Sequence, residues 1–238
     1  MKVVVKSSMV ALTSVFMLAV PGAPIGLVGQ ELENGVFHYS LVDVDASRAT
    51  GTTTGRWEGS GWIGTDIDRF WWNTGGEGDD GGLYEAEAML LYGRYARRFW
   101  DLVVGYRHEI EPTSQGYFTF GVMGLAPYWF EVGLFGFVSD QGEPSLRFEG
   151  ENDMYLTQRL VLQLRTELDW LITADDEVDL AAGFRGVEVG LRTRYEIRRK
   201  LAPYVDLTWS REKARHVPAP RDIDADGLRL RLGVRLIY

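Results

Sequence analysis

Histidine and methionine are the side chains in this sequence best suited to bind a transition metal. Those that follow residue 30 are His38, His108, His216, Met89, Met123 and Met154. Thioether and imidazole groups are ligands that Cu(I) prefers, and imidazole also binds Cu(II). The strand alternation described below predicts that His38, Met89 and Met123 point to the same side of a sheet, which makes them the candidate metal ligands. Methionine also fills irregular gaps in protein interiors, so simple packing is the competing interpretation.

A second set of candidate functional residues consists of acidic and arginine side chains that alternate with apolar ones. Its members are Glu85, Glu87, Asp101, Arg107, Glu131, Arg147, Glu149, Glu151, Arg165, Glu167, Glu188, Arg192, Arg194, Glu196, Arg229, Arg231 and Arg235. If the strands close into a barrel, these side chains project into its interior, the lumen. Mixed charges there either pair into a network or line a narrow water path. We expect a filled or narrowly hydrated lumen, because open porins usually have about 16 to 18 strands.

The strands that position these residues are indicated by alternation of apolar and polar side chains. Between residues 159 and 170, Leu160, Leu162 and Leu164 share one face, while Gln163 and Arg165 share the other. The same period of two returns at 187–197 and at 228–238. Segments of about ten residues suit a tilted strand that crosses a membrane and exceed the usual strand length of soluble sheets. The pattern predicts an all-β protein.

The links between strands predict how many strands there are. Short links are expected near residues 65–67, 97–99, 126–127, 157–158 and 200–202, and long polar links near 46–55, 75–82, 111–116, 140–144, 173–184 and 211–225. Outer-membrane barrels have short periplasmic turns and longer extracellular loops. We therefore predict a transmembrane antiparallel up-and-down β-barrel of about twelve strands, with both termini on the periplasmic side.

The N-terminal residues have the pattern of an export signal. Lys2 and Lys6 precede an apolar run from Met9 to Val20, which is too short to span a bilayer as a helix. We predict a signal peptide at residues 1–25, with its boundary between 20 and 30, and an outer-membrane barrel at residues 31–238. This places the mature protein in the outer membrane of a Gram-negative bacterium, with membrane lipids as partners.

Composition excludes several classes of function. The formal net charge is −9, and no basic stripe is present, which argues against nucleic acid as a partner. The absence of cysteine excludes disulfides, zinc-thiolate sites and a cysteine nucleophile. We predict that the protein is not an enzyme. The competing class is a lipid hydrolase, which needs a serine and a histidine side by side, and the residues available are His108, His216, Ser114 and Ser139.

Acidic clusters in the predicted loops allow a third interpretation. They comprise Asp79 and Asp80, Asp175 to Glu177, and Asp222, Asp224 and Asp226. Such carboxylates can bind Ca²⁺ or bridge to lipopolysaccharide through a divalent cation. The spacing does not match an EF-hand loop, so ordinary solvated charge is the simpler expectation.

Several ordered motifs resemble the copper resistance protein B family. They are GWIGTDIDRFWW at 61–72, LLYGR at 90–94, FWDLVVGYRHE at 99–109, GLAPYWFEV at 124–132, FVSDQGEPSLRFEGE at 137–151, LTQRLVLQLRTEL at 156–168 and RYEIRRKLAPYV at 194–205. The resemblance covers most of the chain after about residue 56. It implies an outer-membrane barrel that contributes to copper resistance, with copper ion as ligand or cargo and a periplasmic copper-handling protein as a further partner.

The sequence departs from this family in one respect. Family members commonly carry a long N-terminal segment rich in histidine and methionine, whereas the region between the signal and the first motif here has one histidine, His38, and no methionine. Copper binding is therefore implied by the resemblance without support from such a segment. The alternative is a copper-independent small-solute channel or structural barrel of the same fold.

Overall fold

The computed structural model describes residues 35–49, 52–173, 182–212 and 227–238. Twelve antiparallel strands close into one barrel, because β1 pairs with both β2 and β12. The strands are β1 Phe37–Ala49, β2 Thr52–Gly64, β3 Asp68–Asp79, β4 Gly82–Arg97, β5 Trp100–Glu111, β6 Gln115–Ala126, β7 Phe130–Ser139, β8 Pro144–Tyr155, β9 Leu160–Leu171, β10 Gly183–Tyr195, β11 Leu201–Glu212 and β12 Gly227–Ile237. The predicted twelve-stranded β-barrel is confirmed.

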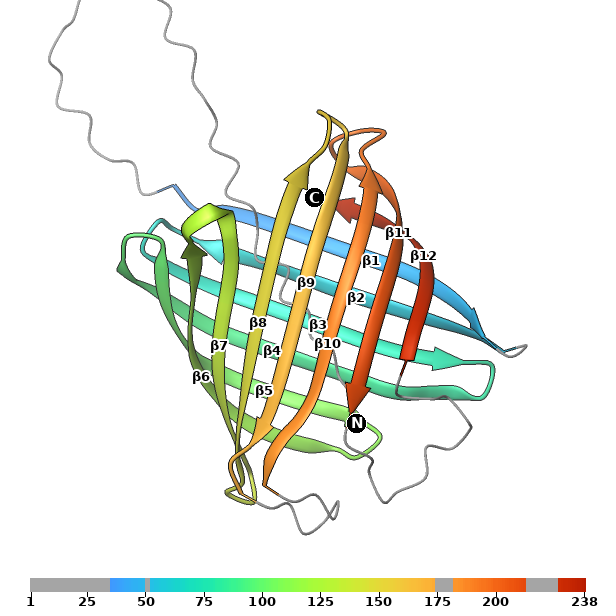
Figure 1. The fold of residues 1–238 in the computed structure, drawn as a ribbon. Coiled ribbons are helices and arrows are strands. Elements are labelled where there is room, and N and C mark those ends of the chain that lie inside the picture. The colour runs from blue at the N-terminus through green and yellow to red at the C-terminus, as the bar shows by residue number, and fades with distance from the viewer. Residues whose placement is uncertain (1–34, 50–51, 174–181, 213–226) are drawn as a thin grey trace, which may run out of the picture.

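The links between strands lie at the two ends of the barrel (Figure 1). The start of β1 and the end of β12 lie at the upper-left end, where Ser40 and Tyr238 exchange backbone hydrogen bonds of 3.0 and 2.8 Å. The links at 65–67, 98–99, 127–129, 156–159 and 196–200 lie at this same end, called here the turn end. The links after β5, β7, β9 and β11 lie at the opposite end, called the loop end.

Two links that were predicted to be long are short. Strand β3 runs to Asp79 and β4 starts at Gly82, so the predicted long link at 75–82 is wrong. Gly82 has a φ of 123°, and Asp79 Oδ1 accepts a hydrogen bond of 2.6 Å from Gly81 N, which makes a tight turn. The predicted link at 46–55 is also wrong, because Ala46 to Ala49 pair in register with residues 52–55. The glycine-rich and polar sequence suggested loops here, but most of these residues form strands that pair with their neighbours.

The remaining expectations concern the ends of strands or residues outside the described ranges. The short link predicted at 200–202 lies at 196–200. The predicted signal peptide at 1–25 lies outside the described residues. So does much of the predicted links at 173–184 and 211–225, with most of their acidic residues.

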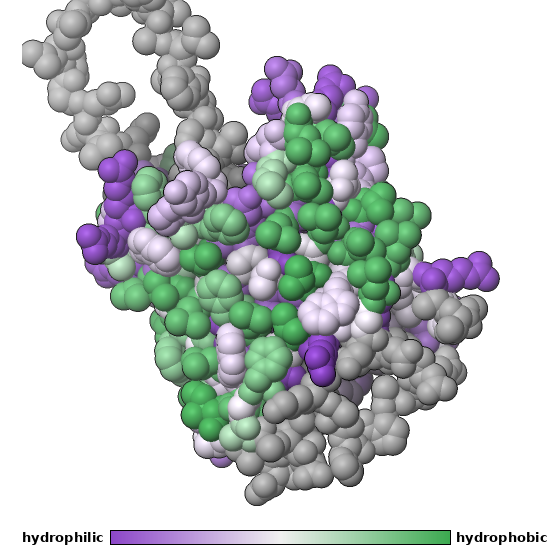
Figure 2. Space-filling view, viewed as in Figure 1, coloured by the Kyte–Doolittle hydropathy of each residue, from purple (hydrophilic) through white to green (hydrophobic). Residues whose placement is uncertain are grey.

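The barrel reverses the usual arrangement of polar and apolar side chains. Along β12, Leu228, Leu230 and Leu232 are about 60% exposed, whereas Arg231 and Arg235 are 4% exposed. Figure 2 shows hydrophobic residues spread over the middle of the visible outer surface. An outer face of leucine, valine and aromatic side chains is favourable in contact with lipid chains. Within the described parts of the chain, no helix is long and apolar enough to cross a membrane.

Close contact between β4 and β5 requires glycine at position 105. A Cβ added to Gly105 would lie 2.0 Å from the backbone oxygen of Leu90. Gly105→Ala is therefore expected to lower the free energy of unfolding by about 1–3 kcal/mol, measured by urea titration in micelles. Gly55→Ala is the matched control, because a Cβ there meets nothing within 4 Å. Equal stability of the two variants would contradict the expected clash.

Candidate functional site

An ion-pair network fills the lumen at about mid-height. Arg192 of β10 lies at its centre and is 0% exposed. Its guanidinium donates to Asp206 of β11 at 2.9 and 3.1 Å and to Asp43 of β1, and it stacks 4.0 Å from the ring centroid of Tyr204. Arg235 of β12 also donates to Asp43, at 2.8 and 2.9 Å. Each buried charge therefore has an oppositely charged neighbour, as burial requires.

The same network crosses the lumen. Arg56 of β2 binds Asp45 at 2.7 Å and Glu58 at 3.2 Å. Arg165 of β9 binds Asp206, and its Nη1 lies 3.8 Å from Glu58 of β2, a strand on the far side of the sheet order. The central network is defined as Asp43, Asp45, Arg56, Glu58, Arg165, Arg192, Asp206 and Arg235. Because these side chains are almost wholly buried, the lumen is closed at this level, in agreement with the expected filled interior.

Five of the eight members of the central network were missed by sequence reasoning. Asp43, Asp45, Arg56, Glu58 and Asp206 were absent from the predicted lumenal set, yet each is at most 7% exposed. The signal for the first two is the alternation of Asp43 and Asp45 with Val42 and Val44 in β1. That run is short and is followed by polar residues, so it is less evident than the runs in β9 and β12.

A group of glutamates lies between the central network and the loop end. Glu149 of β8, Glu167 of β9 and Glu188 of β10 are directly opposite one another in register. Carboxylates in directly opposite positions have Cβ atoms about 4.5–5.5 Å apart and repel each other. Arg147 lies 3.4 Å from Glu167 and 2.9 Å from Asp169. We call Glu149, Glu167 and Glu188 the glutamate row.

Three buried oxygens of two glutamates near this row accept no hydrogen bond from the described residues. They belong to Glu167, whose Oε2 is unsatisfied, and to Glu87 of β4, where both oxygens are unsatisfied and the residue is 1% exposed. Glu87 lies near the row, because its neighbour Arg107 and the row's neighbour Arg147 lie over the same ring of Phe137, 4.3 and 5.7 Å from its centroid. Glu87 has an arginine within reach, since Arg107 Nε lies 3.8 Å away. Unsatisfied buried carboxylate oxygens favour the entry of a cation or water.

Met89 and Met123 lie in an apolar part of the lumen wall. They are 2% and 3% exposed and belong to a cluster with Trp71, Leu91, Val103, Phe135 and Phe137. In register, Met89 of β4 is opposite Arg107 of β5, which is opposite Tyr117 of β6. Met123 lies six residues further along β6 than Tyr117. At about 3.3 Å per residue, this offset is roughly 20 Å along the strands. Their predicted lumenal orientation is correct, but the two sulfurs are not placed to share one metal ion.

His38 does not point into the lumen, so this part of the prediction is wrong. Pairing along β1 is continuous, with Leu41, Asp43 and Asp45 buried and Val44 53% exposed. Even-numbered residues of β1 therefore face outward, and His38 lies at the turn end with its ring 6.0 Å from that of Tyr238. The structure does not bring His38, Met89 and Met123 together. Among the described residues, no three histidine, aspartate or glutamate side chains converge as a ready-made metal site.

One serine–histidine pair is present on the outer surface. Ser114 Oγ lies 3.2 Å from Nε2 of His108, whose ring stacks on Tyr106. Both residues are among those that the sequence offers to a lipid hydrolase. Among the described residues, no carboxylate hydrogen-bonds to the other ring nitrogen, Nδ1, where a hydrolase of this type needs an orienting acid. His216 lies outside the described residues. The pair therefore does not form a catalytic triad.

Twelve antiparallel strands with a lipid-compatible outer face and a charged, closed lumen define a β-barrel of the outer-membrane type. The solved structure of the NanC porin has a similar fold, with a TM-score of 0.57, 12% sequence identity, and coverage of 82% of this chain and 98% of the porin. The chain belongs to the family described as copper resistance protein B precursor, whose family model matches residues 37–238.

Two relatives support this assignment. Copper resistance protein B of Escherichia coli is 37% identical over 187 residues, which cover 77% of this chain and 63% of the relative. The copper resistance protein B homolog of Pseudomonas syringae pv. tomato (strain ATCC BAA-871 / DC3000) is 37% identical over 185 residues, covering 76% and 63%. This chain thus spans somewhat less than two thirds of either relative.

Proposed function

We propose that this protein contributes to copper resistance in the outer membrane of a Gram-negative bacterium by holding copper ions at carboxylates of its lumen. The observation that carries the proposal is the glutamate row, three directly opposed carboxylates in the wall of a closed barrel. Membership of the copper resistance protein B family supports copper as the ion. A periplasmic copper-handling protein is the proposed partner for delivery or removal of the metal.

Cu(II) is the oxidation state that suits these ligands. Divalent copper binds nitrogen and oxygen sites more strongly than the other divalent first-row metals do. Two opposed glutamates such as Glu149 and Glu167 can reach one ion between them, with water in the remaining positions. Because the carboxylates do not converge as a preformed cage, binding is expected to be weak enough for release. This is a requirement for any protein that passes an ion on.

A soft Cu(I) site has less support. It would use the methionines, but Met89 and Met123 lie at different heights in an apolar cluster, and His38 lies outside the lumen. The alternative of a copper-independent solute channel requires an open path. The central network leaves Arg192 and Asp206 with no exposed surface, which favours a closed barrel over a channel.

Copper tolerance of cells tests this proposal. In a copper-sensitive Gram-negative strain that lacks a family member, the wild-type protein should raise the copper concentration that permits growth. The triple variant Glu149→Gln, Glu167→Gln, Glu188→Gln should return this concentration to that of cells without the protein, because glutamine keeps the shape and removes the charge.

A matched control removes the same amount of charge elsewhere. Asp66→Asn, Asp80→Asn, Asp140→Asn changes three exposed residues at the ends of the barrel and should retain wild-type tolerance. Folded protein is verified for each variant by its mobility on an unheated gel. Unchanged tolerance in the folded glutamine variant would count against the glutamate row as the site.

A further inference from the structure

The turn end of the barrel carries a group of exposed cations. Its members, called here the basic collar, are Arg97, Arg98, Arg159, Arg198, Arg199 and Lys200. Arg97 ends β4, and the others come from the links β4–β5, β8–β9 and β10–β11. The whole chain has a net charge of −9, so this concentration of positive charge at one end is not a result of composition.

Among the described residues, the acidic side chains at the turn end do little to neutralise the collar. Asp68 accepts a hydrogen bond of 2.5 Å from Tyr92 and lies 3.9 Å from Arg94, which is not a collar member. Glu196 lies 3.8 Å from the lumenal Arg194. Asp66 is exposed in the β2–β3 link. No described acidic residue therefore prevents the collar cations from contacting an anionic ligand from outside the barrel.

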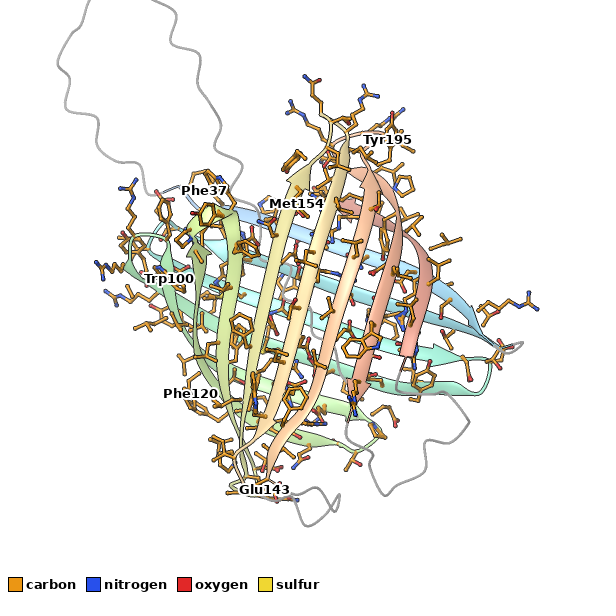
Figure 3. All side chains as sticks on the ribbon, in the orientation of Figure 1. Phe37, Trp100, Phe120, Glu143, Met154 and Tyr195 are labelled. Carbon is orange, nitrogen blue, oxygen red and sulfur yellow. The ribbon has the colours of Figure 1, made fainter. Side chains whose placement is uncertain are left out.

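Exposed aromatic residues lie beside these cations. Tyr128 and Trp129, in the β6–β7 link, are 87% and 71% exposed. Tyr155 and Tyr195 also border the turn end, and Figure 3 labels Tyr195 there with Trp100 and Phe37. Tyrosine and tryptophan favour the headgroup level of a bilayer, where the ring is buried and its polar edge remains hydrated. The aromatic residues thus mark the membrane surface at this end.

Direct contacts place the cations at the same level as the aromatic rings. The guanidinium of Arg98 lies 5.0 Å from the ring centroid of Phe99, and the ammonium of Lys200 lies 4.8 Å from that of Tyr238. These are cation–π distances. Arginine and lysine at headgroup height contact lipid phosphates, and guanidinium groups can bind them in bidentate fashion.

The aromatic link is held in an unusual backbone conformation. Tyr128 and Trp129 have φ values of 65° and 63°, in the left-handed region that non-glycine residues rarely adopt. Asn152 of β8, 8% exposed, donates hydrogen bonds of 3.1 Å to the carbonyls of both residues. The buried Asn152 side chain thus holds the backbone of two residues whose aromatic rings are exposed, which is consistent with a binding role.

We infer that the basic collar and its aromatic residues select anionic phospholipids, those with a phosphatidylglycerol-type headgroup, in the leaflet at the turn end. The occupant is argued from charge complementarity and from the continuity of the collar with the lipid-facing surface. The inference rests on the proposed membrane location and is independent of copper binding. An acidic protein that docks on the same collar is the competing occupant.

The test compares two lipids around the full-length barrel reconstituted in phosphatidylcholine vesicles. Spin-labelled phosphatidylglycerol or spin-labelled phosphatidylcholine is added, and electron paramagnetic resonance measures how much of each is immobilised by the protein. The wild type should prefer phosphatidylglycerol by about fivefold or more, since each cation near an anionic lipid surface contributes about this factor. The preference should fall as salt is raised.

Two variants locate the effect. Arg98→Gln, Arg199→Gln removes two collar cations and should reduce the preference by at least about half. Arg48→Gln, Arg211→Gln removes two exposed cations at the loop end and should leave it unchanged. Equal immobilisation of the two lipids by the wild type, or equal loss in both variants, would overturn the inference and favour a protein ligand or none. A barrel that fails to insert into vesicles would contradict the membrane location instead.

Discussion

Replacing Arg192 with alanine is expected to lower the free energy of unfolding by about 3–5 kcal/mol. The side chain has no exposed surface, and its removal leaves the carboxylates of Asp206 and Asp43 in the closed lumen with fewer partners. It also removes the stacking contact with Tyr204. Breaking a buried ion pair on one side is costly because an uncompensated charge stays buried.

Urea titration of the refolded protein in detergent micelles, followed by tryptophan fluorescence, measures this difference. Arg48→Ala is the matched control, because Arg48 is exposed at the loop end and its loss should change stability by no more than about 0.5 kcal/mol. An Arg192 variant as stable as the control would show that the central network is loosely hydrated, and that the lumen is not closed by it.

The strands of the second half of the chain could be predicted because their alternation extends over most of each strand. In most of β9 and β12 a charged or polar residue alternates with leucine or another apolar residue, so only one face can meet lipid. The physical requirement is strict, since a slip of one residue would place arginine in the bilayer. This is why the lumenal orientation of Arg165, Glu167, Arg231 and Arg235 follows from sequence alone.

The first four strands were harder to predict because glycine and tryptophan replace the alternation there. Gly76 makes space for the ring of Trp57, since a Cβ at this position would lie 2.1 Å from it. In sequence, such a glycine-rich stretch is indistinguishable from a loop. In β1 the polar pattern changes phase between His38–Ser40 and Asp43–Asp45, and only the continuous pairing with β2 shows which phase is lumenal.

The candidate site shows what alternation leaves undetermined. It predicts the face on which a side chain lies, but not its height in the barrel, which depends on register between strands. Met89 and Met123 share the lumenal face and are still far apart, whereas Glu149, Glu167 and Glu188 lie directly opposite one another. All three glutamates were predicted to face the lumen, but their alignment in a row required the register.

Copper binding to the purified barrel tests the proposed role most directly. The protein, refolded in detergent, is titrated with Cu(II) and with Cu(I) against competing chelators, and the bound metal is counted. We expect saturable Cu(II) binding that is at least about tenfold weaker in the Glu149→Gln, Glu167→Gln, Glu188→Gln variant, since even residues that merely support metal ligands cost about 10–100-fold when removed. Met89→Leu, Met123→Leu should bind as the wild type does.

The variant with Asp66→Asn, Asp80→Asn, Asp140→Asn is again the control for charge, and it should also bind as the wild type does. Saturable Cu(II) binding that depends on the glutamate row would support copper capture in the lumen. Absence of saturable binding to the folded wild type, or binding that persists in the glutamine variant, would contradict it.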